Sequence, residues 1–272
     1  MTKRVLFFTK SSGYEHSVIK KAGPEPSHAE RVLLVLAARH GWDVSHTKDG
    51  SVFTVETLAR TDAFVFYTTG DLTTAGTDGT PPLSQDAKAR LLEAIRNGKG
   101  FVGIHSATDT FHSPGARFSN AGDRADPYIK MLGAEFIQHG KQQVATLRCA
   151  DPSFPGCADF KDGLELMEEW YSFKDYQKDL HVIFAQETEG MEKTGKDSVY
   201  ARPPYPATWA RMHGKGRVFY TSLGHREDVW THASFQSILA GGITWALRQA
   251  EADVTPNLAQ VTSSYAVLPP EQ

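Results

Sequence analysis

The sequence predicts an α/β fold with a doubly wound, mostly parallel sheet in a single domain. Short apolar runs that suit buried strands alternate with amphipathic stretches that suit helices, which is the order of parallel strands joined by right-handed crossovers. The 272 residues, 40% of them hydrophobic and 22% charged, suffice for one large core. We expect residues 1–250 to form the domain and residues 251–272 a C-terminal tail, because periodicity ends after Glu251.

Four apolar runs in the first part of the chain predict parallel strands, at residues 4–9, 42–46, 63–68 and 100–104. The third run, Ala-Phe-Val-Phe-Tyr-Thr, does not alternate with polar residues, which is typical of a strand buried on both faces. The first run is too short for the apolar core of a signal peptide and is followed by no cleavage site, so we interpret it as a strand.

Two helices are predicted in the same region, before the second and the fourth strand. Pro26 suits the first turn of one helix and Gly41 its end. Ser84 suits the cap of the other, and Asn97-Gly98 its end. Their apolar faces repeat at helical spacing and consist of Val32, Leu33, Leu36 and Ala37 in the first, and Leu91, Leu92 and Ile95 in the second.

The second half of the sequence is less regular. Strands are predicted at residues 144–148, 182–186, 207–212 and 217–222, and the last two are joined by His213-Gly214-Lys215-Gly216, a hairpin signal. A helix is expected from about Thr231 to Arg248. Residues 109–127 are rich in Gly, Ser, Pro and Asp and are expected to form an insertion or lid loop.

Composition and motifs argue against several classes of function. The net charge of -3 gives no basic surface for nucleic acid or acidic lipid. No run approaches the ~20 apolar residues of a membrane helix. Cys149 and Cys157 are too few for a disulfide framework or an all-cysteine zinc site. A single bridge between them is the alternative, and reduced thiols in a cytoplasmic protein are the simpler expectation. Neither GxGxxG after the first strand nor a P-loop is present, so no nucleotide cofactor is expected.

The segment Phe101–Ala107 is the strongest candidate for a functional turn. A buried strand turns sharply at His105 into a predicted helix, and small residues stand two positions before and after it. That is the pattern of a nucleophile elbow, in which small neighbours permit a strained turn that exposes the central residue. A histidine at this place suits metal binding or proton transfer; the alternative is a structural histidine that fills the turn.

Other histidines follow predicted strands. His16 lies in the loop after the first strand and His225 after the last, and loops at the carboxyl ends of parallel strands converge on a ligand crevice. His139 and the acidic pair Glu168-Glu169 are candidates to join them. Imidazoles with a carboxylate suit a divalent ion of the zinc or manganese type, or acid–base catalysis. The alternative is that several of the 11 histidines are ordinary surface residues, since no HExxH spacing occurs.

The same segments resemble the ThuA-like proteins of trehalose utilisation, a branch of the class I glutamine amidotransferase-like superfamily. The resemblance covers roughly residues 3–248 and rests on residues 5–16, 65–72, 100–109, 132–139, 168–173, 206–209 and 219–225. It implies a flavodoxin-like fold. It also implies that His105 replaces the amidotransferase cysteine, so that glutaminase activity is not expected, and that the partner is a small carbohydrate.

The resemblance leads to two hypotheses of function. The first is an enzyme that cleaves an oxidised (3-keto) glycoside by hydrolysis or elimination. His105 or Glu169 would take the acidic C2 proton, while a metal held by His16, His105, His139 and His225, or His225 itself, stabilises the enolate. The residues expected to bind the sugar are Tyr14, Asp71, Trp170, Tyr171 and Trp209. The second hypothesis is a non-catalytic carbohydrate-binding or partner protein, and a homo-oligomer is left open for both.

Overall fold

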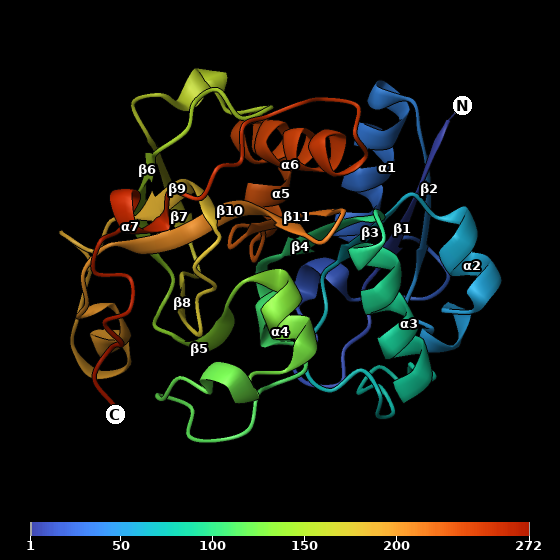
Figure 1. Ribbon diagram of the computed structural model, residues 1–272, viewed down its shortest axis with the longest axis horizontal. Coiled ribbons are helices and arrows are strands. Elements are labelled where there is room, and N and C mark those ends of the chain that lie inside the picture. Colours follow the sequence, from blue (N-terminus) through green and yellow to red (C-terminus); the bar gives the residue numbers. More distant parts are fainter. Residues whose placement is uncertain (1, 272) are drawn as a thin grey trace.

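The computed structural model describes residues 2–271 and centres on a nine-stranded sheet in the order β2-β1-β3-β4-β11-β10-β9-β6-β7 (Figure 1). The first five strands in this order are parallel. They are β2 (Trp42–Thr47), β1 (Lys3–Phe8), β3 (Ala63–Phe66), β4 (Gly100–Ile104) and β11 (Gly216–Thr221). This arrangement confirms the predicted fold class, and every strand predicted in the first part of the chain is present with bounds shifted by a residue or two.

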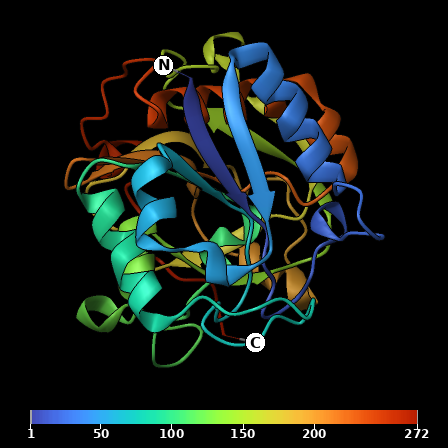
Figure 2. The same cartoon turned by 90° about the vertical axis from the view of Figure 1, so that its right-hand side faces the viewer.

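Helices cover both faces of the parallel strands (Figures 1 and 2). One face packs against α1 (His28–His40) and α6 (Ala233–Ala246), and the other against α2 (Val55–Arg60), α3 (Gln85–Arg96) and α4 (Pro127–Leu132). Successive strand residues alternate between the two cores: Phe7 faces one and Phe8 the other, and both are fully buried. Ser84 caps α3 as predicted, since its side chain accepts a hydrogen bond from the backbone of Ala87.

The other side of the sheet is antiparallel. It consists of β10 (Tyr205–His213), β9 (His181–Gln186), β6 (Gln143–Cys149) and β7 (Leu164–Glu168). The predicted hairpin joins β10 to β11 and thereby connects the two sides of the sheet. A separate pair, β5 (Glu135–His139) and β8 (Tyr171–Lys174), was not predicted and is also antiparallel. It lies below the main sheet in Figure 1.

The helix predicted from about Thr231 to Arg248 is confirmed as α6, and a short helix that was not predicted, α5 (Glu227–Thr231), precedes it. The chain breaks between them because His232 adopts an extended conformation (ψ 131°) and its side chain caps α6. The C-terminal tail is packed rather than frayed. It contains α7 (Leu258–Val261), Leu258 is buried, and the side chain of Asn257 accepts a hydrogen bond from the backbone of Val182.

The loop over residues 109–127 is held by several hydrogen bonds, among them bonds to two carboxylates. The backbone of Ser113 donates to the buried carboxylate of Glu135, and the backbones of Ala121 and Gly122 donate to Asp175. It contains one 3-10 turn, over Gly122–Arg124. These bonds fasten the loop to the β5–β8 pair and its flank. Among residues 2–271, no helix has the length and apolar character needed to cross a bilayer.

Candidate active site

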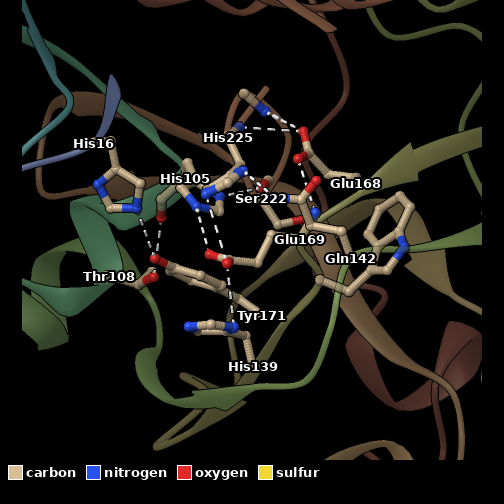
Figure 3. A network of polar contacts seen from close by, with 12 residues as sticks. His16, His105, Thr108, His139, Gln142, Glu168, Glu169, Tyr171, Ser222 and His225 are labelled. Carbon is tan, nitrogen blue, oxygen red and sulfur yellow. Dashed lines mark hydrogen bonds and ion pairs between the residues drawn. The ribbon is translucent and has the colours of Figure 1, made fainter. Parts of the chain in front are cut away.

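The three histidines that follow strands β1, β4 and β11 meet at the carboxyl edge of the parallel strands (Figure 3). Their ring centres lie 5.1 Å apart for His16 and His105, and 5.4 Å apart for His225 and each of the other two. The prediction that these side chains share one place is therefore confirmed. They converge because parallel strands end at the same edge of a sheet.

His105 occupies a strained turn. Its φ of 45° lies in the left-handed region, which residues other than glycine seldom adopt. Its carbonyl accepts a hydrogen bond of 2.7 Å from the Tyr220 hydroxyl. Small neighbours are required, because a Cβ on Gly103 would lie 3.2 Å from Cβ of Ala107 and 2.9 Å from Leu132. The predicted exposure is wrong, because His105 is fully buried, whereas the predicted helix is present as a five-residue 3-10 helix that begins at His105.

Glu169, in the link between β7 and β8, lies at the centre of the cluster. Its Oε2 is 3.6 Å from Nε2 of His105, and its Oε1 is 3.2 Å from Nδ1 of His139 and 3.5 Å from Nε2 of His225. Figure 3 shows the carboxylate with His105 and His225 on one side and His139 on the other. Burial opposes ionisation of Glu169, but its contacts with His105, and with His225 and His139, lower its pKa overall.

Both ring nitrogens of His105 have defined surroundings. Nδ1 lies 2.8 Å from the carbonyl oxygen of Ser222, which can only accept, so Nδ1 is a donor, and Nε2 faces Glu169. That Nε2 is buried and makes no hydrogen bond. A histidine whose other nitrogen donates to a backbone carbonyl is the usual arrangement of a metal ligand.

Three of these side chains lie close enough together to hold one metal ion. One ligand atom from each of His16, His105 and Glu169 lies within 4.8 Å of the other two. Nδ1 of His16 is buried without a hydrogen-bond partner, while its Nε2 is 3.4 Å from the Tyr171 hydroxyl. Burial and the charge of His105 keep the pKa of His16 well below its usual value, so its imidazole is neutral, the form that binds metal. Three protein ligands and an open position are typical of catalytic zinc.

The remaining two histidines, His139 and His225, contact Oε1 of Glu169. His139 is 42% exposed and His225 17% exposed by side chain, so they form the accessible side of the cluster. Nδ1 of His139 also lies 2.8 Å from the carbonyl oxygen of Gly140, the next residue in the chain, which makes this nitrogen a donor. Burial and the charge of His105 lower the pKa of His225 to about 4, so it is neutral at pH 7.

Glu168 has a different role from its neighbour. It is fully buried, and its carboxylate accepts hydrogen bonds from the backbone nitrogens of Gly224 (2.9 Å), His225 (3.2 Å) and Glu169 (2.8 Å). It thus ties the end of β7 to the turn after β11. Burial raises the pKa of Glu168. The sequence indicates an acidic pair here, but nothing in it separates the residue that faces the histidines from the one that holds the backbone.

The predicted sugar-binding aromatics do not all lie at the site. Trp170 and Trp209 are fully buried and donate to the carbonyls of Gln143 and Leu132, so the prediction that they bind sugar is wrong. Tyr171 belongs to the cluster, but its ring is covered by His105 at 4.1 Å and Phe136 at 4.0 Å between ring centres, which leaves no face for a sugar. Tyr14 alone among the four is exposed (69%), with its ring 5.0 Å from that of His16.

Asp71 fits the ordinary alternative. It is exposed, and its Oδ1 accepts hydrogen bonds from the backbone (2.9 Å) and hydroxyl (2.6 Å) of Thr73, which is a local turn. Several other histidines also follow the structural interpretation. His181, for example, lies between the Asp151 carboxylate and the carbonyl of Thr255, both of which accept from its ring. Sequence reasoning missed Ser222, which contacts His105, and Gln142, which contacts His225. Ser222 makes its contact through the backbone carbonyl, so its side chain gives no sign of this role.

A cavity of about 670 Å³ lies at the opposite, amino edge of the strands, between α2, α3 and the end of α6. Its lining includes Leu58, Ala94 and Leu247 and none of the clustered histidines. Ligands of open α/β sheets bind beyond the carboxyl ends of the strands, so the histidine cluster is the stronger candidate for the active site.

Comparison with known proteins agrees with the fold. The chain resembles the crystal structures of ThuA-like proteins from Bacteroides uniformis (16% identity, TM-score 0.61, covering 90% of this chain and 91% of the other) and Parabacteroides merdae (18%, 0.59, 93% and 92%). It also resembles a cytoplasmic protein of Salmonella typhimurium (12%, 0.53, 90% and 98%). Identities this low show a shared fold. No curated protein matches the sequence.

The family is shown by a match over most of the sequence. Residues 4–246 match the model of the ThuA family, described as trehalose utilisation. This range contains both sides of the main sheet and the whole histidine cluster. The chain therefore belongs to the ThuA family, whose description connects it with the metabolism of a sugar.

Proposed function

We propose that this protein is a metal-dependent enzyme that cleaves an oxidised (3-keto) glycoside by elimination or hydrolysis. The observation that carries the proposal is the pair His105 and Glu169. Nε2 of buried His105 makes no hydrogen bond and faces a carboxylate oxygen of Glu169 at 3.6 Å, and a divalent ion bound between these two atoms would satisfy both. The family's connection with trehalose utilisation supports a sugar as substrate.

His16, His105 and Glu169 are the residues that would hold the ion. Their donor set, two imidazoles and one carboxylate, suits zinc or manganese. A divalent ion held there would polarise the keto oxygen of the substrate and make the neighbouring C2 proton more acidic. Tyr171 packs against the ring of His105 and places its hydroxyl beside His16, so it would keep both rings in position.

The chemistry of the substrate then assigns the other roles. Removal of the C2 proton of a 3-keto glycoside leaves an enolate, the bond from C1 to the leaving oxygen breaks, and that oxygen takes a proton; addition of water to the resulting double bond completes a hydrolysis. Glu169 is ionised at neutral pH, and its Oε1 faces the accessible side, so it is the residue that takes the proton. Neutral His225 would donate a hydrogen bond to the developing oxyanion. Tyr14 is positioned to contact the sugar ring.

Turnover of a defined substrate tests the proposal. The assay uses a disaccharide such as trehalose oxidised at C3 of one ring, and compares protein loaded with Zn²⁺ or Mn²⁺ with protein treated with a chelator. We expect cleavage only by the loaded protein. Turnover that is indifferent to the chelator would leave Glu169 as base without a metal and overturn the metal role. Sugar binding without any turnover would favour the second hypothesis, a carbohydrate-binding protein.

A further inference from the structure

A chain of polar contacts runs from the surface to Glu169. Arg226 donates to both carboxylate oxygens of Asp228 at 2.8 Å, and its Nη1 donates to Oε1 of Gln142 at 2.6 Å. Nε2 of Gln142 lies 3.3 Å from Nδ1 of His225, and Nε2 of His225 lies 3.5 Å from Oε1 of Glu169. Figure 3 shows Gln142 reaching the far side of the His225 ring from Glu169.

The direction of every bond in this chain is fixed by its first member. A guanidinium can only donate, so the Gln142 amide must turn its oxygen to Arg226 and its NH₂ group to His225. Asp228 holds the guanidinium through two parallel bonds, which keeps it from turning away. Nδ1 of His225 must therefore accept, and the single hydrogen of the neutral ring lies on Nε2, toward Glu169.

The backbone of His225 is fixed as well. Its nitrogen donates to the buried carboxylate of Glu168, so the ring is held from its own main chain and from the Gln142 amide. Two independent supports leave the ring one orientation and one tautomer. Outer residues of this kind commonly set the tautomer and direction of catalytic histidines.

We infer that Gln142 is a positioning residue, which holds His225 in the tautomer whose Nε2–H points into the site. The inference rests on the proposed function, because it is His225 in this tautomer that would donate to the oxyanion of the substrate. Gln142 is exposed, on the turn between β5 and β6, and far in sequence from the strand-end histidines. Neither motif nor spacing in the sequence marks it.

Replacement of the donor by an acceptor tests this role. In Gln142→Glu the carboxylate accepts from His225, so Nδ1 must carry a hydrogen. Nitrogen NMR of ¹⁵N-histidine-labelled protein distinguishes protonated from unprotonated ring nitrogens, and the His225 signals among the 11 histidines are assigned by their loss in His225→Gln. Lys141→Gln is the matched control, because it changes the net charge equally at the neighbouring exposed residue without altering the His225 contact.

We expect the wild type and Lys141→Gln to show Nδ1 unprotonated and Nε2 protonated, and Gln142→Glu to show Nδ1 protonated. Turnover by Gln142→Glu should fall by about 10- to 100-fold, mainly in kcat, with Lys141→Gln unchanged. An Nδ1 that is protonated in the wild type, or unprotonated in Gln142→Glu, would overturn the inference whatever the activity. If the tautomer changes as expected while the wild type cleaves no keto-glycoside, the positioning role stands and the proposed function fails.

Discussion

The parallel and antiparallel sides of the sheet contribute differently to the candidate site. The parallel side supplies His16, His105 and His225, each just beyond a strand end. The antiparallel side and the β5–β8 pair supply Glu169 and His139. The histidines converge because of the topology, whereas the carboxylate is brought to them by a connection between β7 and β8 that belongs to neither helix nor strand. The parallel side brings the three histidines together, and the other side adds the carboxylate that contacts them.

The bonds of Glu168 show how the two sides are joined. Its carboxylate lies at the end of β7 and accepts from the backbone beyond β11, so the position of Glu169 is tied directly to that of His225. Charge-assisted hydrogen bonds to backbone nitrogens are strong when buried. If the two sides act as one site, substitutions on either side should lower activity to a similar extent.

The largest effect is expected for Glu169→Gln and His105→Asn. Each should lower kcat/KM on a keto-glycoside by about 10²- to 10⁴-fold, because each removes one half of the His105–Glu169 pair. Asn is chosen because it tolerates the left-handed conformation at residue 105. Steady-state kinetics of the double variant sharpen the test: it should be little worse than either single variant. Losses that multiply in full would show that the two residues act independently.

The next effect concerns the contact between α6 and the loop after β6. A Cβ on Gly241 would lie 1.8 Å from the carbonyl oxygen of Pro155, and neither backbone can yield easily. We expect Gly241→Ala to lower the free energy of unfolding by about 3 kcal/mol in urea titrations. Ser237→Ala, which removes a hydrogen bond to Gly156 at the same contact, should cost about 1 kcal/mol. Equal stability of the two variants would mean that this contact does not hold the two sides together.

Within the parallel side, Gly103→Val should be milder. Its Cβ would meet the end of the Leu132 side chain at 2.9 Å and Ala107 at 3.2 Å, and Leu132 can move in part. The expected loss of unfolding free energy is about 2 kcal/mol through overpacking. Thermal and urea unfolding measure it. A variant as stable as the wild type would show that the turn at His105 does not need a small residue before it.

The smallest effect is a pH dependence at the junction of the loop with β5. His112 lies between Asp109 (3.0 Å) and Glu135 (3.2 Å), and hydrogen bonds to these two carboxylates raise its pKa to about 9. A raised pKa stabilises the fold fully below the unfolded value of about 6.5, and this stabilisation is lost as pH rises through 9. Since the side chain is 46% exposed, the gain is ~1 kcal/mol or less.

Urea titrations at pH 6 and pH 10 measure this contribution as the difference between wild type and His112→Gln. The wild type should lose more stability between the two pH values than the variant. An equal loss in both proteins would mean that His112 is not charged in the folded state at pH 6, or that its ion pairs are too well solvated to count.

Much of the parallel side could be predicted from the sequence. Apolar runs such as 63–68 and capping residues such as Ser84 act locally, so the pattern and the structure agree there. The β5–β8 pair and β7 escaped prediction because their residues are held by distant partners rather than by local periodicity. Pairing of Phe136 with Phe173, for example, joins segments on either side of the whole β6–β7 hairpin.

The site divides in the same way. The proximity of His16, His105 and His225 could be predicted, because strand ends of a parallel sheet converge. The exposure of His105 and the roles of Trp170 and Trp209 could not, since the direction of a side chain depends on tertiary packing. Trp170 directly follows the central Glu169, yet its ring points into the core. Proximity in sequence is a poor guide in a connection without regular structure.

Metal binding tests the central claim that both sides of the sheet build one metal site. Zn²⁺ and Mn²⁺ are titrated calorimetrically into chelator-treated wild type, His105→Asn, Glu169→Gln and the control His181→Asn, whose histidine is held by Asp151 away from the cluster. We expect one ion per chain for the wild type and the control, and a loss of affinity of at least about tenfold in both site variants. A wild type that binds neither ion, or site variants that bind as tightly as the control, would contradict this claim.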